Sequence, residues 1–324
     1  MNDDFSTDPS GFGPTRGIER VRPAPRPGLR KDEIAAKKRG NYIFSFGFPG
    51  SGKTTFQWFL MNYIMNEGDW RSTIDVPDTT NGPDWGGRRI INEWKEQWIT
   101  GRFPEPNKTA ESDIREVTAK VATVSGRRIE LDFSFLEVSG ELLKMVLPLE
   151  NRNPQLSESI QAYFANPGFR SVLMLMLHPD VEENDKLFPS LITYLDKEFP
   201  GLRSRLSLGV IISKPEASLQ RLRTYGSVDG RFDYDTLDEL ALEDYLNRFC
   251  GETYQIWRDW PGKDRTLLAP LHLGEIDTKG EEPLLVRPDY RHIEAIFHWI
   301  VEQFTGQRPG PTFLDMLKGR MSWR

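Results

Sequence analysis

The stretch Gly47-Phe48-Pro49-Gly50-Ser51-Gly52-Lys53-Thr54 decides the fold of this chain. It matches the pattern G-x-x-x-x-G-K-[ST] at every fixed position. A short β-rich run, residues 42–46, precedes it, and apolar residues at helical spacing follow it from Phe56 to Ile64. This order of strand, glycine-rich loop and helix predicts a loop that wraps the phosphates of a nucleoside triphosphate.

The residue types in this loop each suit a part of phosphate binding. Glycines let the backbone fold its N–H groups around phosphate oxygens, and the start of a helix adds positive potential. Lys53 is expected to reach the β and γ phosphates and to assist catalysis, and the Thr54 hydroxyl is expected to ligate Mg²⁺. The residues predicted to contact phosphate are Gly47, Pro49, Gly50, Ser51, Gly52, Lys53, Thr54 and Thr55.

The chain predicts one folded domain over residues 41–306, flanked by two tails. Residues 1–40 are rich in Pro, Gly and Arg and lack apolar periodicity, which predicts a flexible tail. Its basic stretch is the one segment that would suit an acidic partner or RNA. Residues 307–324 predict a second tail with a short amphipathic segment, and residues 68–106 an insertion with a helix over 88–100.

Strand and helix signals alternate through the rest of the domain. A hairpin is expected over 114–124 and 129–138. Further strands are expected at 171–177, 206–213 and 266–273, and helices at 185–199, 235–249 and 290–304. This alternation predicts an α/β fold of the P-loop NTPase type, with a mainly parallel sheet, helices on both faces and one β-hairpin edge.

Composition restricts the partners and the compartment. The 42 basic and 48 acidic residues give a net charge of -6, which favours no general attraction to nucleic acid or to an anionic membrane. No apolar run approaches the length of a membrane span. The single cysteine, Cys250, rules out an internal disulfide, so a cytoplasmic protein is expected.

Two later motifs bear on the choice of nucleotide. The strand at 129–136 leads into Glu137-Val138-Ser139-Gly140-Glu141, which is similar to the D-x-x-G element of regulatory GTPases with Glu in place of Asp. The strand at 206–213 ends in Ser213-Lys214-Pro215-Glu216, which is similar to their [NT]-K-x-D element. Guanine presents a ring N1–H and an exocyclic amine, and the Glu216 carboxylate can accept both. These features favour GTP over ATP.

The order of these motifs resembles the TRAFAC class of P-loop GTPases over about residues 41–272, and within it the bacterial double-GTPase group of conflict systems. The resemblance implies a Ras-like sheet, a GTP-dependent switch with Mg²⁺, and slow hydrolysis stimulated by a protein effector or a second GTPase subunit. Its implied site residues are Glu137 and Thr109 for Mg²⁺, Gly140 for the γ phosphate, Glu141 for the attacking water, and Ser213, Lys214 and Glu216 for the base.

Other interpretations of the sequence stay open. A P-loop ATPase or kinase would use Asp132 instead of Glu137 as its magnesium carboxylate. A scaffold that binds nucleotide without turnover would explain the unusual carboxylates, since Glu141 adds negative charge beside the γ phosphate. Arg88, Arg89 and Arg102 are candidates for an internal arginine finger, although solvated surface charge is their ordinary role.

Overall fold

The structure is a computed structural model that describes residues 40–67, 69–75, 86–105, 114–124, 128–148, 153–181, 183–224 and 239–310. The tails expected at both ends therefore lie almost entirely outside the described residues, and so does Thr109. The strands are β1 (Gly40–Phe46), β2 (Trp70–Asp75), β3 (Ile114–Thr123), β4 (Glu130–Val138), β5 (Phe169–Leu177), β6 (Leu206–Ser213), β7 (Thr266–Leu271), β8 (Gly274–Asp277) and β9 (Leu284–Pro288).

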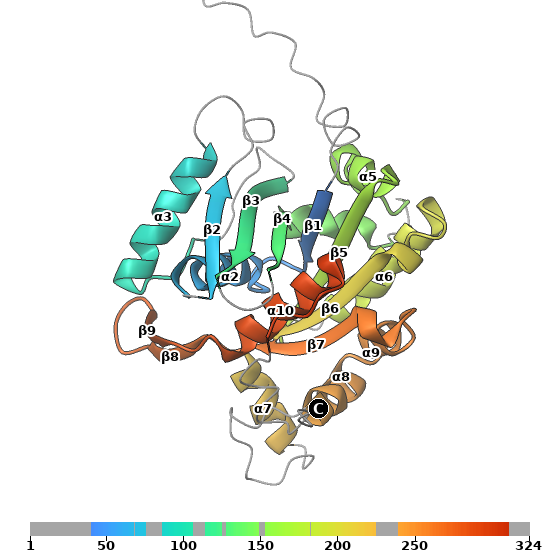
Figure 1. Cartoon of the computed structure of the whole chain (residues 1–324). Helices are drawn as coiled ribbons and strands as arrows, with labels where there is room; N and C mark the ends of the chain where they lie inside the picture. Colours follow the sequence, from blue (N-terminus) through green and yellow to red (C-terminus); the bar gives the residue numbers. More distant parts are fainter. Residues whose placement is uncertain are drawn as a thin grey trace, which may run out of the picture. The chain divides into compact units, whose positions relative to one another are not determined.

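The helices of this part of the chain connect these strands (Figure 1). They are α2 (Lys53–Asn66), α3 (Gly86–Thr100), α4 (Gly140–Leu143), α5 (Glu158–Ala165), α6 (Asn184–Glu198), α7 (Pro215–Thr224), α8 (Glu239–Phe249), α9 (Gly251–Arg258) and α10 (Arg291–Thr305). Short 3-10 turns, Lys144–Val146, Arg203–Arg205 and Lys263–Arg265, follow α4 and precede β6 and β7.

Seven strands form one sheet in the order β2-β3-β4-β1-β5-β6-β7. The five strands from β4 to β7 in this order are parallel, and β3 and β2 add to them in antiparallel fashion. The prediction of a mainly parallel α/β sheet of the P-loop type is confirmed. The hairpin of β3 and β4 is present, but it is not the edge of the sheet, because β2 pairs along the outer side of β3. The predicted insertion therefore contributes a strand as well as its helix.

Side chains of the central strands alternate between two apolar cores, one on each face of the sheet. On β5, Leu173 and Leu175 join the core covered by α5, α6, α8 and α9. Val172 and Met174 join the core covered by α2, α3 and α10. Helices thus cover both faces, as the layers in Figure 1 show, and the strand and helix on either side of the phosphate loop, β1 and α2, are both packed in these cores.

A two-stranded ribbon of β8 and β9 follows the last strand of the sheet and holds the end of α3. The Leu285 N–H donates to the Gly101 carbonyl oxygen at 2.7 Å, and Arg102 forms a β-bridge with Leu284. Gly101 has φ of 70°, and a Cβ there would lie 2.6 Å from the Leu285 oxygen, so this contact requires glycine. The segment after Arg102 is thereby directed toward the phosphate loop.

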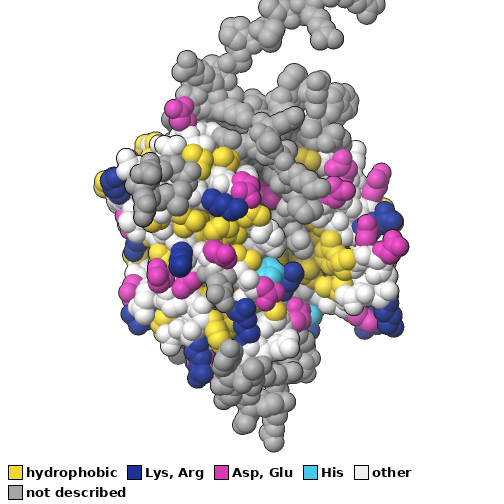
Figure 2. Space-filling view, turned by 180° about the vertical axis from the view of Figure 1, so that it is seen from behind, with side chains coloured by type: hydrophobic (Ala, Val, Ile, Leu, Met, Phe, Trp, Pro, Cys, Tyr) yellow, Lys and Arg dark blue, Asp and Glu magenta, His cyan; other side chains and the backbone are white. Residues whose placement is uncertain are grey.

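The described surface mixes charges of both signs. Figure 2 shows basic and acidic side chains interspersed over the described part of one face, as the net charge of -6 leads one to expect. None of the helices in the described ranges combines the length and the apolar character that a bilayer crossing requires.

Candidate nucleotide-binding site

The glycine-rich loop lies where the sequence predicts it, between the carboxyl end of β1 and the first residue of α2. Gly50 and Gly52 have φ of 80° and 87°, in the left-handed region that favours glycine. At Gly47, a Cβ would lie 2.7 Å from the Met176 carbonyl oxygen and 2.4 Å from the Ser51 hydroxyl. Glycine at these three positions is therefore needed for the loop to close over the end of the sheet.

Lys53 is buried under the loop that it is predicted to serve. Its Nζ donates to the Gly47 carbonyl oxygen at 2.8 Å and to the Phe48 carbonyl oxygen at 3.0 Å. An ammonium group has three N–H donors, so one remains for a phosphate oxygen. Burial lowers the pKa of Lys53 to about 8, and the negative charge of Glu137 opposes that shift. An arriving phosphate would favour the charged form further.

Thr54 and Glu137 form a buried pair of oxygen groups at the proposed metal position. The Thr54 hydroxyl donates to Glu137 Oε1 at 2.6 Å. Thr54 stands in the first turn of α2 and Glu137 near the carboxyl end of β4, so two separate elements bring these oxygens together. Magnesium prefers oxygen ligands and usually keeps several waters beside one or two protein groups and phosphate oxygens. The pair fits this donor set.

The turn after β4 touches the phosphate loop directly. A Cβ at Gly140 would lie 2.5 Å from the backbone nitrogen of Pro49 and 2.8 Å from the carbonyl carbon of Phe48. Only glycine allows so close an approach, which explains the residue type at Gly140. Because the two backbones are in contact, a shift of the turn would move the loop, and the reverse also holds.

Glu141 follows this glycine and is exposed at the rim of the site. Its carboxylate forms an ion pair with Lys144 one helical turn later, with Nζ 2.9 Å from Oε2. Lys144 Nζ also lies 6.0 Å from the centre of the Phe48 ring. The ion pair partly neutralises the negative charge that a carboxylate would otherwise bring close to a γ phosphate.

A cavity of about 420 Å³ joins these features. Two of its lining residues, Pro104 and Ser139, were not predicted from the sequence. Pro104 belongs to the segment that the β8–β9 ribbon holds at Gly101. The full lining consists of Pro49, Gly50, Gly52, Lys53, Thr54, Thr55, Pro104, Glu137, Ser139, Gly140 and Glu141.

Asp132, the alternative magnesium carboxylate, does not line this cavity. It is exposed near the start of β4, where its carboxylate lies 3.7 Å from Lys120 Nζ. Among the arginine-finger candidates, Arg102 is exposed and lies 3.8 Å from Glu282. The side chains of Arg88 and Arg89 lie outside the described residues.

The predicted base motif lies beside the loop, at the end of the neighbouring strand pair. The Ser213 hydroxyl donates to the Leu177 carbonyl oxygen at 3.2 Å, and a Cβ at Gly52 would lie 3.3 Å from Ser213 Cβ. Lys214 is exposed and has a positive φ of 48°, which is uncommon for a residue with a side chain. Glu216 stands in the first turn of α7.

Two contacts of the site were missed by the sequence. His272 follows β7, and its Nδ1 lies 2.8 Å from Glu216 Oε1, so it holds the carboxylate at the base motif. Asn184, the first residue of α6, is fully buried and accepts the Phe48 N–H through Oδ1 at 3.3 Å. Both join residues far apart in the sequence, and no local pattern indicates such pairs.

The sheet order, the loop between β1 and α2 and the adjoining cavity define the P-loop type of α/β protein. No protein-family model matches the chain, and no curated protein is similar enough to count as a match. Among solved structures it is similar to the signal recognition particle receptor SRb-GTP/SRX complex from Chaetomium thermophilum. The identity is 12%, the match covers 82% of this chain and 99% of that chain, and the TM-score is 0.37. That similarity is too distant to assign a function.

Proposed function

We propose that this chain binds GTP with Mg²⁺ and acts as a switch. The proposal rests on the contact between the phosphate loop, at Gly52, and the predicted base motif, at Ser213. A Cβ added to Gly52 would lie 3.3 Å from the side chain of Ser213, which begins the segment that ends in Glu216. A triphosphate site and a carboxylate suited to guanine therefore share one rim of the sheet, at the carboxyl ends of its parallel strands, where ligands of such folds bind.

In this proposal the backbone amides of the loop, together with Lys53 and Thr55, hold the phosphates, while Ser213, Lys214 and Glu216 contact the base. Thr54 and Glu137 hold Mg²⁺, which would neutralise charge on the β and γ phosphates. Thr109 remains the proposed second threonine ligand from a part of the chain outside the described ranges.

The switch element of the proposal is the turn at Gly140. A γ phosphate that accepts the Gly140 N–H would pull this turn inward, and its loss would release the turn. Because Gly140 is the first residue of α4 and contacts Pro49, the change would reach Glu141 and the phosphate loop. The resemblance to double-GTPase proteins supports a protein effector or a second GTPase subunit as the partner that senses this change.

A substitution at Thr54 tests the metal site. Thr54→Val keeps the shape of the side chain and removes the hydroxyl. The factor by which Mg²⁺ raises the affinity for GTP should therefore fall at least tenfold, which corresponds to about 1.4 kcal/mol. Thr193→Val, an exposed position on α6, is the matched control and should behave as the unchanged chain. Equal Mg²⁺ dependence in the chain with Thr54→Val and in the control would rule out the metal role.

Binding without turnover is the second candidate, and the ion pair of Glu141 with Lys144 favours it. A carboxylate held by a neighbouring ammonium is less free to orient an attacking water. Phosphate release should be measured for the unchanged chain and for Lys53→Ala. Slow phosphate release by the unchanged chain that disappears in Lys53→Ala supports hydrolysis. Release at the same background rate from both proteins supports a nucleotide-binding scaffold.

A further inference from the structure

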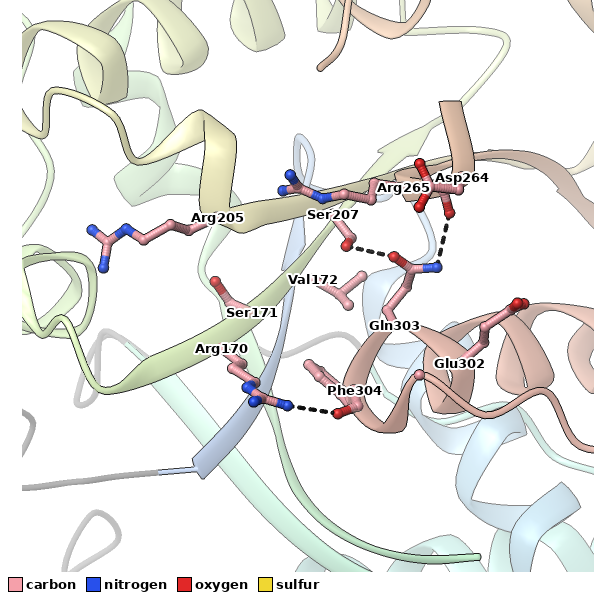
Figure 3. Close-up of a pocket in the computed structure, with 11 residues that line it drawn as sticks. Arg170, Ser171, Val172, Arg205, Ser207, Asp264, Arg265, Glu302, Gln303 and Phe304 are labelled. Atoms are coloured by element: carbon pink, nitrogen blue, oxygen red, sulfur yellow. Dashed lines mark hydrogen bonds between the residues drawn. The ribbon is translucent and has the colours of Figure 1, made fainter. Parts of the chain in front are cut away.

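A second cavity, of about 450 Å³, lies at the amino ends of β5, β6 and β7 (Figure 3). Since these strands run parallel to β1, this is the edge of the sheet opposite the phosphate loop. Ligands of parallel α/β sheets usually bind at the carboxyl ends of the strands, so this cavity is separate from the proposed nucleotide site. The last turn of α10 forms its other wall.

Three arginines from three different segments line the cavity: Arg170 on β5, Arg205 before β6 and Arg265 before β7. Ser171 on β5 pairs with Leu206 on β6. Arg170 directly precedes Ser171, and Arg205 directly precedes Leu206, so the two arginines lie at the starts of neighbouring strands. None of the three forms an ion pair with a carboxylate in the ranges that the structure describes. The three guanidinium groups outnumber the two carboxylates that line the cavity, Asp264 and Glu302, and this excess of positive charge favours an anion.

Two of the guanidinium groups are already held in place. Arg170 Nη1 donates to the Phe304 carbonyl oxygen at 2.9 Å, as Figure 3 shows. Phe304 is in the last turn of α10, so Arg170 also covers the negative end of that helix dipole. Arg265 donates to the carbonyl oxygens of Ser204 and Leu206. These bonds fix the direction of both groups and leave further N–H donors free, which lowers the entropy cost of binding.

Ser207 and Gln303 are satisfied within the cavity wall, whereas the buried Ser171 hydroxyl has no hydrogen-bond partner among the described residues. Ser207 donates to Gln303 Oε1 at 2.7 Å, and Gln303 Nε2 donates to the Asp264 carbonyl oxygen at 3.0 Å. The exposed guanidinium of Arg205 makes no hydrogen bond to any described residue. The strongest unused donors of the cavity are therefore the arginines, and Arg205 is the one that can reorient toward a ligand.

We propose that this cavity binds a compact organic dianion, a phosphate monoester or a dicarboxylate. Guanidinium groups present paired N–H donors that match the oxygens of phosphate and carboxylate, and three of them suit a ligand with two negative charges. The carboxylates of Asp264 and Glu302 also line the cavity and would accept hydrogen bonds from hydroxyl groups of the ligand. The volume lies within the range of roughly 300–1,000 Å³ found for small-molecule sites.

Calorimetric titration of the full chain with glycerol 3-phosphate and with succinate tests this site, with glycerol as the neutral control. Arg205→Gln should weaken dianion binding about tenfold or more, because it removes a charge-assisted hydrogen bond. Arg170→Gln should act in the same direction. Arg71→Gln, an exposed arginine on β2 at the other side of the sheet, is the matched control and should have no effect.

Lys53→Met separates this cavity from the phosphate loop. Dianion binding that persists in Lys53→Met and falls in Arg205→Gln supports the proposal, and the tighter of the two ligands identifies the class. Binding abolished by Lys53→Met, unchanged by both arginine substitutions, or absent from the unchanged chain would overturn it. Thermal unfolding of each variant shows whether the fold persists, and Arg205→Gln breaks no hydrogen bond to the described residues. The outcome does not depend on whether the chain binds GTP.

Discussion

Replacing Glu216 by Gln keeps the size of the side chain and tests how the base is recognised. Guanine offers two N–H groups, from its ring and its exocyclic amine, and a carboxylate can accept both. An amide can accept only one and turns its own NH₂ toward the other. The Glu216 side chain is 47% exposed and shares its carboxylate with His272, so water screens the contact. The expected loss is therefore at the low end for a charged hydrogen bond, about 1.5 kcal/mol.

This loss corresponds to about a tenfold weaker affinity for GTP. Xanthine has a carbonyl oxygen where guanine has its amine, and the amide NH₂ can donate to that oxygen, so XTP should bind more tightly to Glu216→Gln than to the unchanged chain. ATP affinity should not change. Displacement of a fluorescent GTP analogue by each nucleotide measures all three, and Glu281→Gln, an exposed carboxylate elsewhere, is the control. GTP affinity unchanged within twofold in Glu216→Gln would refute the proposed role.

Three further predictions concern the loop itself. Asn184→Ala leaves the buried Phe48 N–H without its acceptor and should lower the free energy of unfolding by about 1–3 kcal/mol in urea denaturation; an unchanged midpoint would contradict this. Gly140→Ala forces a Cβ against the Pro49 backbone and should reduce nucleotide affinity more than tenfold, about 1.4 kcal/mol, a result that equal titration curves would disprove. The pKa of Lys53 is about 8 in the folded chain and 10.5 as its ordinary value, so the unfolded chain binds more protons between these pH values. Stability should therefore rise with pH across that window, and the rise should be smaller in Lys53→Met when both are unfolded by denaturant at several pH values.

Sequence periodicity predicts the central sheet because its strands are long and buried. The runs that became β5 and β6 are mostly apolar and almost entirely buried, and the helix over Arg291–Thr305 has its apolar residues on one face. The edge strand β2 was missed because Trp70–Asp75 is short, contains several polar residues and precedes a stretch rich in turn signals. The strands β8 and β9 are short and largely exposed, so they carry little hydrophobic pattern.

Some residues of the site can be predicted from a local sequence motif, and others depend on contacts between distant parts of the chain. Lys53, Thr54 and the glycines share one continuous motif, and Glu137 stands close to a predicted strand end, where ligand-binding residues gather. The contacts of Asn184 with Phe48 and of His272 with Glu216 join residues 136 and 56 positions apart. Such pairs depend on how α6 and β7 pack in the folded chain, which no local spacing encodes.

A competition between GTP and ATP for the nucleotide-free full chain tests the proposed guanine preference most directly. The protein is incubated with equimolar GTP and ATP in the presence of Mg²⁺, separated from free nucleotide, and denatured, and the released nucleotide is identified by ion-exchange chromatography. Guanine nucleotides should predominate at least tenfold over adenine nucleotides, which corresponds to about 1.4 kcal/mol. Equal amounts, or a predominance of adenine nucleotides, would contradict this preference.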